Sequence, residues 1–305
     1  MIVAEENQKT VAKGIVRFKA KGGETKRQKD NYGNYLSSLS TIQYKYPLKL
    51  MVPQFASSNN CHWVYSINYG GGLVSGDEIA LQIDVEEGCS ALLTTQGSTK
   101  VYHSVDGKTS TQSLTGSVGP RGLLAIIQEP LVCFKDAKYK QTQNFHMEGN
   151  SNLVFVDWIT SGRVANGERW DFTSCSTTNN IFLGTDLVYR DAMRLSNTEN
   201  LSVKDTMKHY NIVASCVVLG PDLTGLIQHI KDDVGKGQNI GELPDPNLIV
   251  SASPLQYAIT NSHEKLSGVM VKCASSEITK VYWKLDNLLK PLYPKLGGNP
   301  FENKY

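Results

Sequence analysis

Apolar and polar residues alternate along much of this chain. Between Trp63 and Tyr69 the apolar and aromatic side chains occupy the odd positions, and Ile79, Leu81, Ile83 and Val85 repeat the pattern. A period of two is typical of a half-buried β-strand. Similar patterns predict further strands at 90–96, 100–104, 121–127, 137–147, 152–159, 168–175, 180–189, 211–219, 248–253, 255–260 and 266–273. Turn signals such as Glu87-Gly88 separate several of them, so the chain is expected to be mainly β.

The expected architecture is a large multi-stranded β-sheet scaffold, either β-helix-like or built of layered sheets, although no internal repeat at a solenoid period is visible. An i, i+3, i+4 spacing of apolar residues predicts two α-helices toward the C-terminus, at 222–234 and 276–289. Segment 195–209 is ambiguous between a loop and a short helix. Residues 1–305 are expected to form a single β-rich domain, with a loop or insertion at 19–34 and a mobile tail at 297–305.

Composition narrows the classes of function. The net charge of the 305 residues is only +2, which is too small for a strongly basic nucleic-acid binder. The N-terminus lacks the apolar region of a signal peptide, and no apolar run approaches the ~20 residues of a membrane helix. The six cysteines lie far apart without a Cys-x-x-Cys pair, so we expect reduced core residues in a cytoplasmic protein with no nucleic-acid or membrane partner.

A glycine cluster at 69–77, YGGGLVSGD, invites a phosphate-binding interpretation that its spacing does not support. Counted from Gly70, Ser75 stands where a dinucleotide fingerprint needs its third glycine, and a strand rather than a helix follows. The Gly-Lys-Ser/Thr of a Walker A loop is absent, and Ser75 is misplaced for a nucleophile elbow. The glycines are therefore expected to serve a tight connection between strands.

Other catalytic and metal signatures are also missing. The six histidines show no His-Glu-x-x-His spacing, and the adjacent pair Cys61-His62 points to opposite faces of a strand. Ser262 to Lys265 matches Ser-x-x-Lys without its companion motifs, so chance explains it. We expect no catalytic residue, no tightly bound cofactor and no tight metal site.

Five blocks, in order, resemble the urease accessory protein family UreD, also called UreH. They are YPLKLMVP at 46–53, YGGGLVSGD at 69–77, ALLTTQGSTKVYHS at 91–104, QEPLVCFKDAKY at 128–139 and SGRVANGERW at 161–170. The second and third blocks are specific to the family. Cys133-Phe134 and the QEP opening look more like its eukaryotic branch, while the C-terminal third resembles the family only in general pattern.

The resemblance implies a non-enzyme. Members of the family are β-rich scaffolds that bind the urease apoprotein and a helical partner, UreF, which recruits the GTPase UreG. The assembly delivers nickel to urease, and nickel is thought to cross the UreD-like subunit along a water-filled internal route. Binding of nickel to this chain is accordingly expected to be transient.

A route that releases nickel should use sparse carboxylates, hydroxyls and waters, because cysteine and histidine sites hold nickel tightly. The matched blocks supply five candidates for this route: Asp77, Thr94, Thr95, Glu129 and Glu168. Alternatively, Asp77 is a satisfied turn acid and Glu168 is the ion-pair partner of Arg163. At most one of the two threonines can face a cavity, since adjacent strand residues alternate. A supporting structural role is expected for Gly70, Gly71, Gly72, Gly76, Gln96, Lys100 and Arg163.

Partner binding has one candidate residue. Trp283 falls outside the main apolar row of the second predicted helix, and aromatic residues are enriched at binding surfaces. The simpler alternative, which we favour from the sequence, is that Trp283 packs on the sheet. Two other classes of function stay open: a β-rich hydrolase that uses Asp77 and Glu168, and a β-rich module that binds a small ligand.

Overall fold

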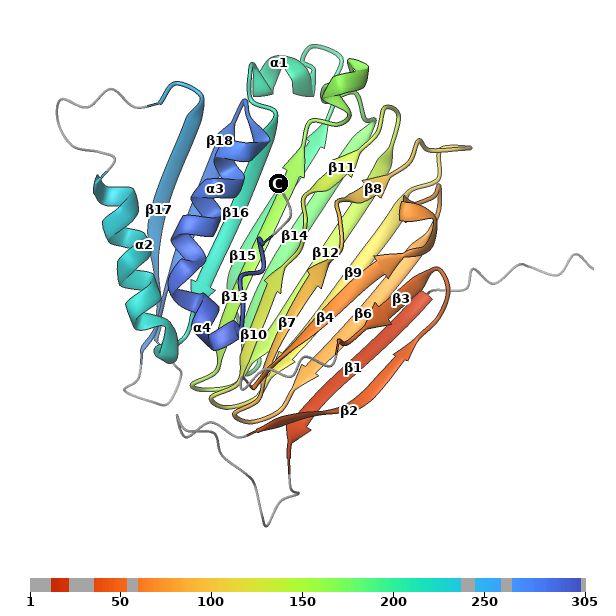
Figure 1. The fold of residues 1–305 in the computed structure, drawn as a ribbon. Helices are drawn as coiled ribbons and strands as arrows, with labels where there is room; N and C mark the ends of the chain where they lie inside the picture. The colour runs from red at the N-terminus through yellow and green to blue at the C-terminus, as the bar shows by residue number, and fades with distance from the viewer. Residues whose placement is uncertain (1–11, 22–35, 54–59, 237–244, 259–264, 303–305) are drawn as a thin grey trace, which may run out of the picture.

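Two β-sheets that face each other form the body of the molecule. The computed structural model describes residues 12–21, 36–53, 60–236, 245–258 and 265–302. Within these ranges the smaller sheet has the order β15 (Asp186–Ser196), β14 (Ser174–Leu183), β12 (Lys138–Met147), β9 (Ser110–Val118), β6 (Glu78–Val85), β1 (Ala12–Ala20) and β2 (Ser37–Tyr44). The larger sheet has the order β17 (Leu248–Ala258), β18 (Lys265–Ser275), β16 (Ile212–Leu219), β13 (Asn152–Thr160), β10 (Leu123–Ile127), β7 (Ser90–Thr95), β4 (Cys61–Asn68) and β3 (Leu48–Met51). Both sheets run across the whole molecule (Figure 1).

The middle of the chain winds as a β-solenoid of about 4 turns, which confirms the mainly β, β-helix-like prediction. Each turn places one strand in the larger sheet and the next long strand in the smaller sheet, and strands of successive turns pair in parallel. Three short strands, β5 (Gly72–Leu73), β8 (Thr99–Val101) and β11 (Leu131–Cys133), pair in parallel with one another, and β11 also pairs with β13 of the larger sheet. Turns of unequal length explain why the sequence shows no repeat: Cys61 stacks on Ser90, Ser90 on Leu123 and Leu123 on Asn152.

Alternation along the strands separates two apolar cores. In β7, Ala91 and Leu93 belong to the core between the sheets, whereas Leu92 belongs to the core on the outer face of the larger sheet. The outer core is covered by α2 (Thr224–Lys236), α3 (Ile278–Leu289) and α4 (Tyr293–Leu296), which lie along one side of that sheet (Figure 1). The two longer helices confirm the predicted pair near the C-terminus. A short helix, α1 (Val203–Met207), occupies part of the ambiguous segment 195–209.

Four short 3-10 helices complete the described elements: η1 (Tyr69–Gly71), η2 (Val164–Asn166), η3 (Pro221–Leu223) and η4 (Lys290–Leu292). No described helix combines the length and the apolar character that crossing a membrane requires. All six cysteines are buried and free, as the sequence predicts.

The structure corrects several element predictions. Strands β1, β2 and β3 were not predicted, and Lys19 lies in β1 rather than in the expected loop, of which residues 22–34 fall outside the described part. Residues 168–173 form no strand, because the chain there turns inward to bury Trp170 and Phe172. The segments predicted at 248–253 and 255–260 are joined in the single strand β17 as far as Ala258, and residues 259 and 260 lie outside the described part. Pro254 is tolerated in β17 because β17 is an edge strand.

The expected mobile tail is packed as far as the structure describes it. Phe301 is buried, and its carbonyl accepts a 2.7 Å hydrogen bond from the Tyr282 hydroxyl of α3. Trp63 of β4 donates to the carbonyl of Leu296 in the same way, at 2.8 Å. Phe301, which follows α4, therefore belongs to the outer core, and residues 303–305 lie outside the described ranges.

The glycine cluster serves the solenoid. Gly70 and Gly71 adopt positive φ angles of 80° and 74°, which favour glycine. Gly72 is extended and pairs with Lys100 of the next turn. A Cβ atom on Gly72 would lie 2.5 Å from the Lys100 carbonyl oxygen, so only glycine lets these two turns stack at this distance.

Replacing Gly72 by alanine is expected to destabilise the protein by about 1–3 kcal/mol, because the new methyl group must push apart two paired backbones. Urea unfolding measures the change. Gly97→Ala is the matched control, since nothing lies within 4 Å of a Cβ atom at Gly97. If both variants unfold at the same urea concentration as the wild type, the close stacking of β5 on β8 is not what requires glycine.

Candidate functional site

The larger sheet carries a row of polar side chains on the face that looks toward the smaller sheet. On each strand of the row, residues two positions away belong to the apolar core between the sheets, as Phe155 does beside Asp157. Side chains two apart on a strand share a face, so the row points into the space between the sheets. Across β4, β7, β13, β16 and β18 its members are Ser66, Thr95, Asp157, Ser215 and Lys272.

The smaller sheet presents a second polar set to this row. Its strands β9, β12 and β14 place Gln112, Gln141 and Thr177 side by side. Two positions further along, the register aligns Gln143 of β12, Asn179 of β14 and Asp191 of β15. We refer to both sets together as the polar layer. It crosses the strands along the solenoid and interrupts an otherwise apolar interior.

Asp157 lies at the centre of the polar layer, and the opposite sheet holds its carboxylate. Gln141 donates from Nε2 to Oδ1 at 3.1 Å, and Asn179 donates from Nδ2 to Oδ2 at 2.7 Å. The buried Tyr139 hydroxyl lies 2.9 Å from Oε1 of the same Gln141 and 2.7 Å from Oε1 of Gln112. Amide and hydroxyl dipoles of three neighbouring strands therefore position this carboxylate.

The surroundings of Asp157 disfavour its charged form. Burial raises the pKa of the Asp157 carboxyl, the hydrogen bonds from Asn179 and Gln141 lower it, and the nearby Asp191 carboxylate raises it again. Lys272 lowers the same pKa by its positive charge. A carboxylate that stays within the protein against a net desolvation cost is typical of a functional group rather than of a stabilising one.

Small cavities adjoin these groups. Two of about 20 Å³ each lie within the polar layer, and both are lined by Gln112, Gln141 and Gln143. Each is large enough for one water molecule, which needs about 10–15 Å³ measured in this way. Oε1 of Gln143 and Oδ1 of Asn179 are buried oxygens without a hydrogen-bond partner in the described residues. Such oxygens are suited to bind water or a passing cation.

Two of the predicted route residues lie at this layer. Glu129 is buried and lines one of the small cavities together with Asp157. Its backbone N–H donates to the hydroxyl of Thr95 at 2.9 Å, which ties Thr95 to the same place. Thr94 is fully buried on the other face of β7, the face that carries Leu92 and the outer core. Only one of the two threonines therefore faces the space between the sheets.

The other two predicted acids serve local structure. Asp77 accepts a 2.9 Å hydrogen bond from the N–H of Val74, as a turn acid does. Glu168 pairs with Arg163 and also accepts from the N–H of Lys135 at 3.2 Å. The hydrogen bond from Arg163 lowers the pKa of Glu168. Neither acid lines the small cavities of the polar layer, and the two share no contact that would support a hydrolase.

The supporting residues predicted from the motifs lie outside the polar layer. Gln96 and Lys100 are exposed, and Gly76 has a φ angle of 82° in the turn before β6. Arg163 packs its guanidinium 4.0 Å from the centre of the Phe134 ring while it pairs with Glu168. These contacts fix the loops at one edge of the sheets.

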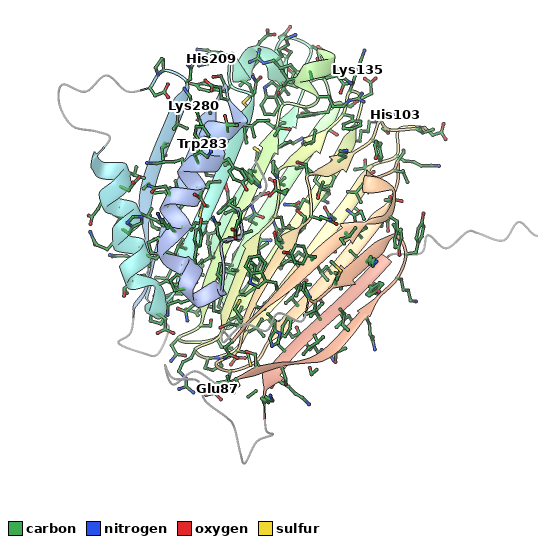
Figure 2. The ribbon with its side chains drawn as sticks, viewed as in Figure 1. Glu87, His103, Lys135, His209, Lys280 and Trp283 are labelled. Atoms are coloured by element: carbon green, nitrogen blue, oxygen red, sulfur yellow. The ribbon has the colours of Figure 1, made fainter. Side chains whose placement is uncertain are left out.

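Trp283 is exposed, which contradicts our preferred expectation that it packs on the sheet. Its side chain is 65% exposed and projects from α3, one turn after Lys280 (Figure 2). The apolar side of α3 is formed instead by Val281, Tyr282 and Leu285. Because Trp283 lies off that row, the helix buries its core residues and leaves the indole at the surface.

Asp157, Asp191 and Lys272 were missed by sequence reasoning. A signal existed for the first, since Asp157 is the one charged residue in the apolar run Leu153–Ile159. A charge within a strand that is otherwise buried on both faces needs a reason. The pairing of Asp191 with Lys272 gives no such signal, because it depends on two strands far apart in the sequence.

Nickel ligands of high affinity do not gather in the part of the chain that the structure describes. No three histidine, cysteine, aspartate or glutamate side chains there come together so that they could hold a metal ion. Burial also raises the pKa of the Cys61 and Cys273 thiols to about 12, so both stay protonated near neutral pH. A protonated thiol is a poor metal ligand.

Comparisons with known proteins bear on the identity of the chain. Residues 25–304 match the family model described as UreD urease accessory protein. A protein named urease accessory protein D from Oryza sativa subsp. indica is 38% identical over 87% of this chain and 91% of its own length. The protein of the same name from Arabidopsis thaliana is 36% identical, over 87% and 95%. One from the bacterium Anaeromyxobacter sp. is 30% identical, over 84% and 80%.

The match extends well beyond the five motif blocks at residues 46–170 and includes the strands and helices of the C-terminal third. The higher identity to the two plant proteins agrees with the eukaryotic character of the QEP block. The chain belongs to the UreD urease accessory protein family.

Proposed function

We propose that this protein is a non-catalytic maturation factor of urease that passes nickel along its polar layer. In this role it acts in the cytoplasm as a scaffold, which binds the urease apoprotein and a UreF-like accessory protein and, through the latter, a UreG-like GTPase. Family membership supports the connection to urease. The continuous polar layer inside an apolar solenoid supports the route for nickel, and it is the observation that carries the proposal.

The chemistry of the polar layer suits a cation in transit. Its groups toward a cation are oxygen atoms of Asp157, Glu129, Thr95 and several amides, which follow one another along the layer. Nickel binds nitrogen and sulfur ligands more tightly than isolated oxygens, so oxygens let it move on. The two small cavities offer room for water, which keeps part of the hydration shell of the ion.

The test of the proposed function uses cells that express urease but lack this chain. Urease purified from them should be present at normal abundance with little nickel per active site, and adding the chain back should restore the nickel. If urease from these cells carries its full nickel content, the proposal is wrong. A module that binds a small ligand would then become the better interpretation.

Trp283 is the docking candidate for one of the protein partners. It forms an exposed stripe with Asn287 of α3 and Lys290 at the start of η4, four and seven positions further on. Exposed aromatic residues often supply much of the binding energy of an interface. Trp283→Ala is therefore expected to weaken co-purification of a partner by about tenfold or more. Leu201→Ala, at another exposed apolar position near α1, is the control. Equal recovery of partners by both variants would remove α3 from the interface.

A further inference from the structure

A larger cavity opens at one end of the polar layer. It has a volume of about 330 Å³ and is lined by strands of both sheets. Its charged groups are Asp157, Asp191 and Lys272, and its hydroxyl groups are those of Thr177, Ser215 and Ser251. Asp157 also lines one of the two small cavities further inside. Asp157 is thus the junction between the wide cavity and the narrow part of the layer.

An ion pair occupies the wide cavity. The Lys272 ammonium group of β18 pairs with Oδ2 of Asp191 on β15, across the gap between the two sheets. Ser215 donates its hydroxyl to the same oxygen at 3.0 Å. The lysine side chain is 42% exposed and the aspartate 23%, so the ammonium group has a way out to solvent. Its long flexible stem allows that movement without a change in the strand.

Asp157 belongs to the same electrostatic group. All three charged side chains line the same cavity, and Asp191 raises the pKa of Asp157 while Lys272 lowers it. Other charges of β15 stay apart, since Arg190 and Arg194 alternate with Asp191 and stand on the outer face of the sheet. The wide cavity at the junction therefore holds two carboxylates and one tethered ammonium group.

This charge balance treats monovalent and divalent cations differently. A potassium ion brings the same charge as the ammonium group, which is already present at high effective concentration because it is tethered. Replacing the ammonium group by a potassium ion therefore gains little electrostatic energy. A divalent ion brings one more positive charge to two carboxylates, and that attraction is strong in a partly dehydrated cavity. Displacement of the lysine ammonium group is therefore favourable for a divalent ion and not for potassium.

The structure assigns to Lys272 the role of a specificity-determining residue: its ammonium group holds the Asp191 carboxylate, and a divalent metal ion passes the junction by displacing it. The assignment rests on the proposed route for nickel and adds a selective step to it. When the metal moves on, the ammonium group returns to Asp191 and helps release the ion.

The test measures binding of Ni²⁺ alone to the purified full chain by isothermal titration calorimetry, with and without potassium chloride. Lys272→Met removes the charge and keeps most of the stem. We expect this variant to bind Ni²⁺ at least about tenfold more tightly than the wild type and to become sensitive to potassium. Lys272→Arg keeps a cation at Asp191 and should show no gain. The double variant Lys272→Met/Asp191→Asn should lose the gain in Ni²⁺ affinity. This result would show that the gain comes from the freed Asp191 carboxylate and not from a change in folding.

Unchanged or weaker Ni²⁺ binding by Lys272→Met overturns the role of Lys272, as does a gain that survives in the double variant. The absence of measurable binding in every variant has the same consequence, because removal of the ammonium group then opens no site. These outcomes leave the proposed function standing if cells without the chain still make nickel-poor urease. Urease with its full nickel content in those cells would contradict both the proposed function and the role of Lys272.

Discussion

Replacing Phe155 by alanine is expected to lower the free energy of unfolding by about 3–5 kcal/mol. Phe155 of β13 is fully buried and stacks on Phe145 of β12, with the ring centres 5.1 Å apart. The two strands belong to opposite sheets, so this pair closes the sandwich on one side of the polar layer. Alanine would remove the aromatic contact and leave a cavity that rigid strands fill only partly.

Urea unfolding followed by circular dichroism measures this loss as a lower midpoint at an unchanged slope. Trp283→Ala serves as the control, because a 65% exposed side chain should change stability by no more than about 0.5 kcal/mol. If Phe155→Ala unfolds at the wild-type midpoint, the facing sheets do not depend on this contact, and the described packing of the interior is wrong.

Replacing Asp157 by asparagine is expected to have the opposite effect and to stabilise the protein by about 1–2 kcal/mol at pH 7. Burial raises the pKa of Asp157, so the folded protein holds its ionised carboxylate at a cost. A neutral amide avoids that cost. Asn179 can pair with it by rotation of its own amide, since Oδ1 of Asn179 lacks a partner in the described residues.

The pH dependence of this gain follows from the raised pKa. Between the unfolded pKa of about 3.9 and the higher folded value, the native state binds more protons than the unfolded state, so the stability contributed by Asp157 is lost as the pH rises. The advantage of Asp157→Asn should therefore be largest at pH 7–8 and disappear near pH 4. Melting temperatures of both proteins across this range measure it. A variant less stable than the wild type at pH 7 would show that the carboxylate is a structural group.

The sequence predicts most of the fold because alternation marks strands with one solvated face and apolar runs mark strands buried on both. Strand β6 is an example of the first and β10 of the second, since all five residues of β10 are buried. Strand β1 was not predicted because Gly14 and the basic residues Lys13, Arg17 and Lys19 interrupt its short apolar pattern. Its Val16 and Phe18 are nonetheless buried, because β6 and β2 complete its pairing. That tertiary context is invisible locally.

The candidate site was harder to predict. Motif acids such as Asp77 and Glu168 stand out in the sequence, yet they close turns and loops at the edge of the sheets. Glu129 and Thr95, chosen for the same reason, lie at the polar layer. The layer itself depends on the register between strands, which brings Asp157, Asn179 and Lys272 together from three separate parts of the chain. Register is set by the packing of whole sheets, and local patterns do not contain it.

The most direct test of the central claim is the nickel content of urease matured in cells that carry Asp157→Asn. Asp84→Asn is the matched control, because Asp84 is a strand aspartate that pairs with Arg17 outside the polar layer. We expect Asp157→Asn to bind its partners normally while urease gains nickel about tenfold more slowly, which corresponds to ~1.4 kcal/mol in the barrier. The Asp84→Asn control should load nickel at the wild-type rate. Normal loading by Asp157→Asn would show that nickel does not pass through the polar layer of this protein.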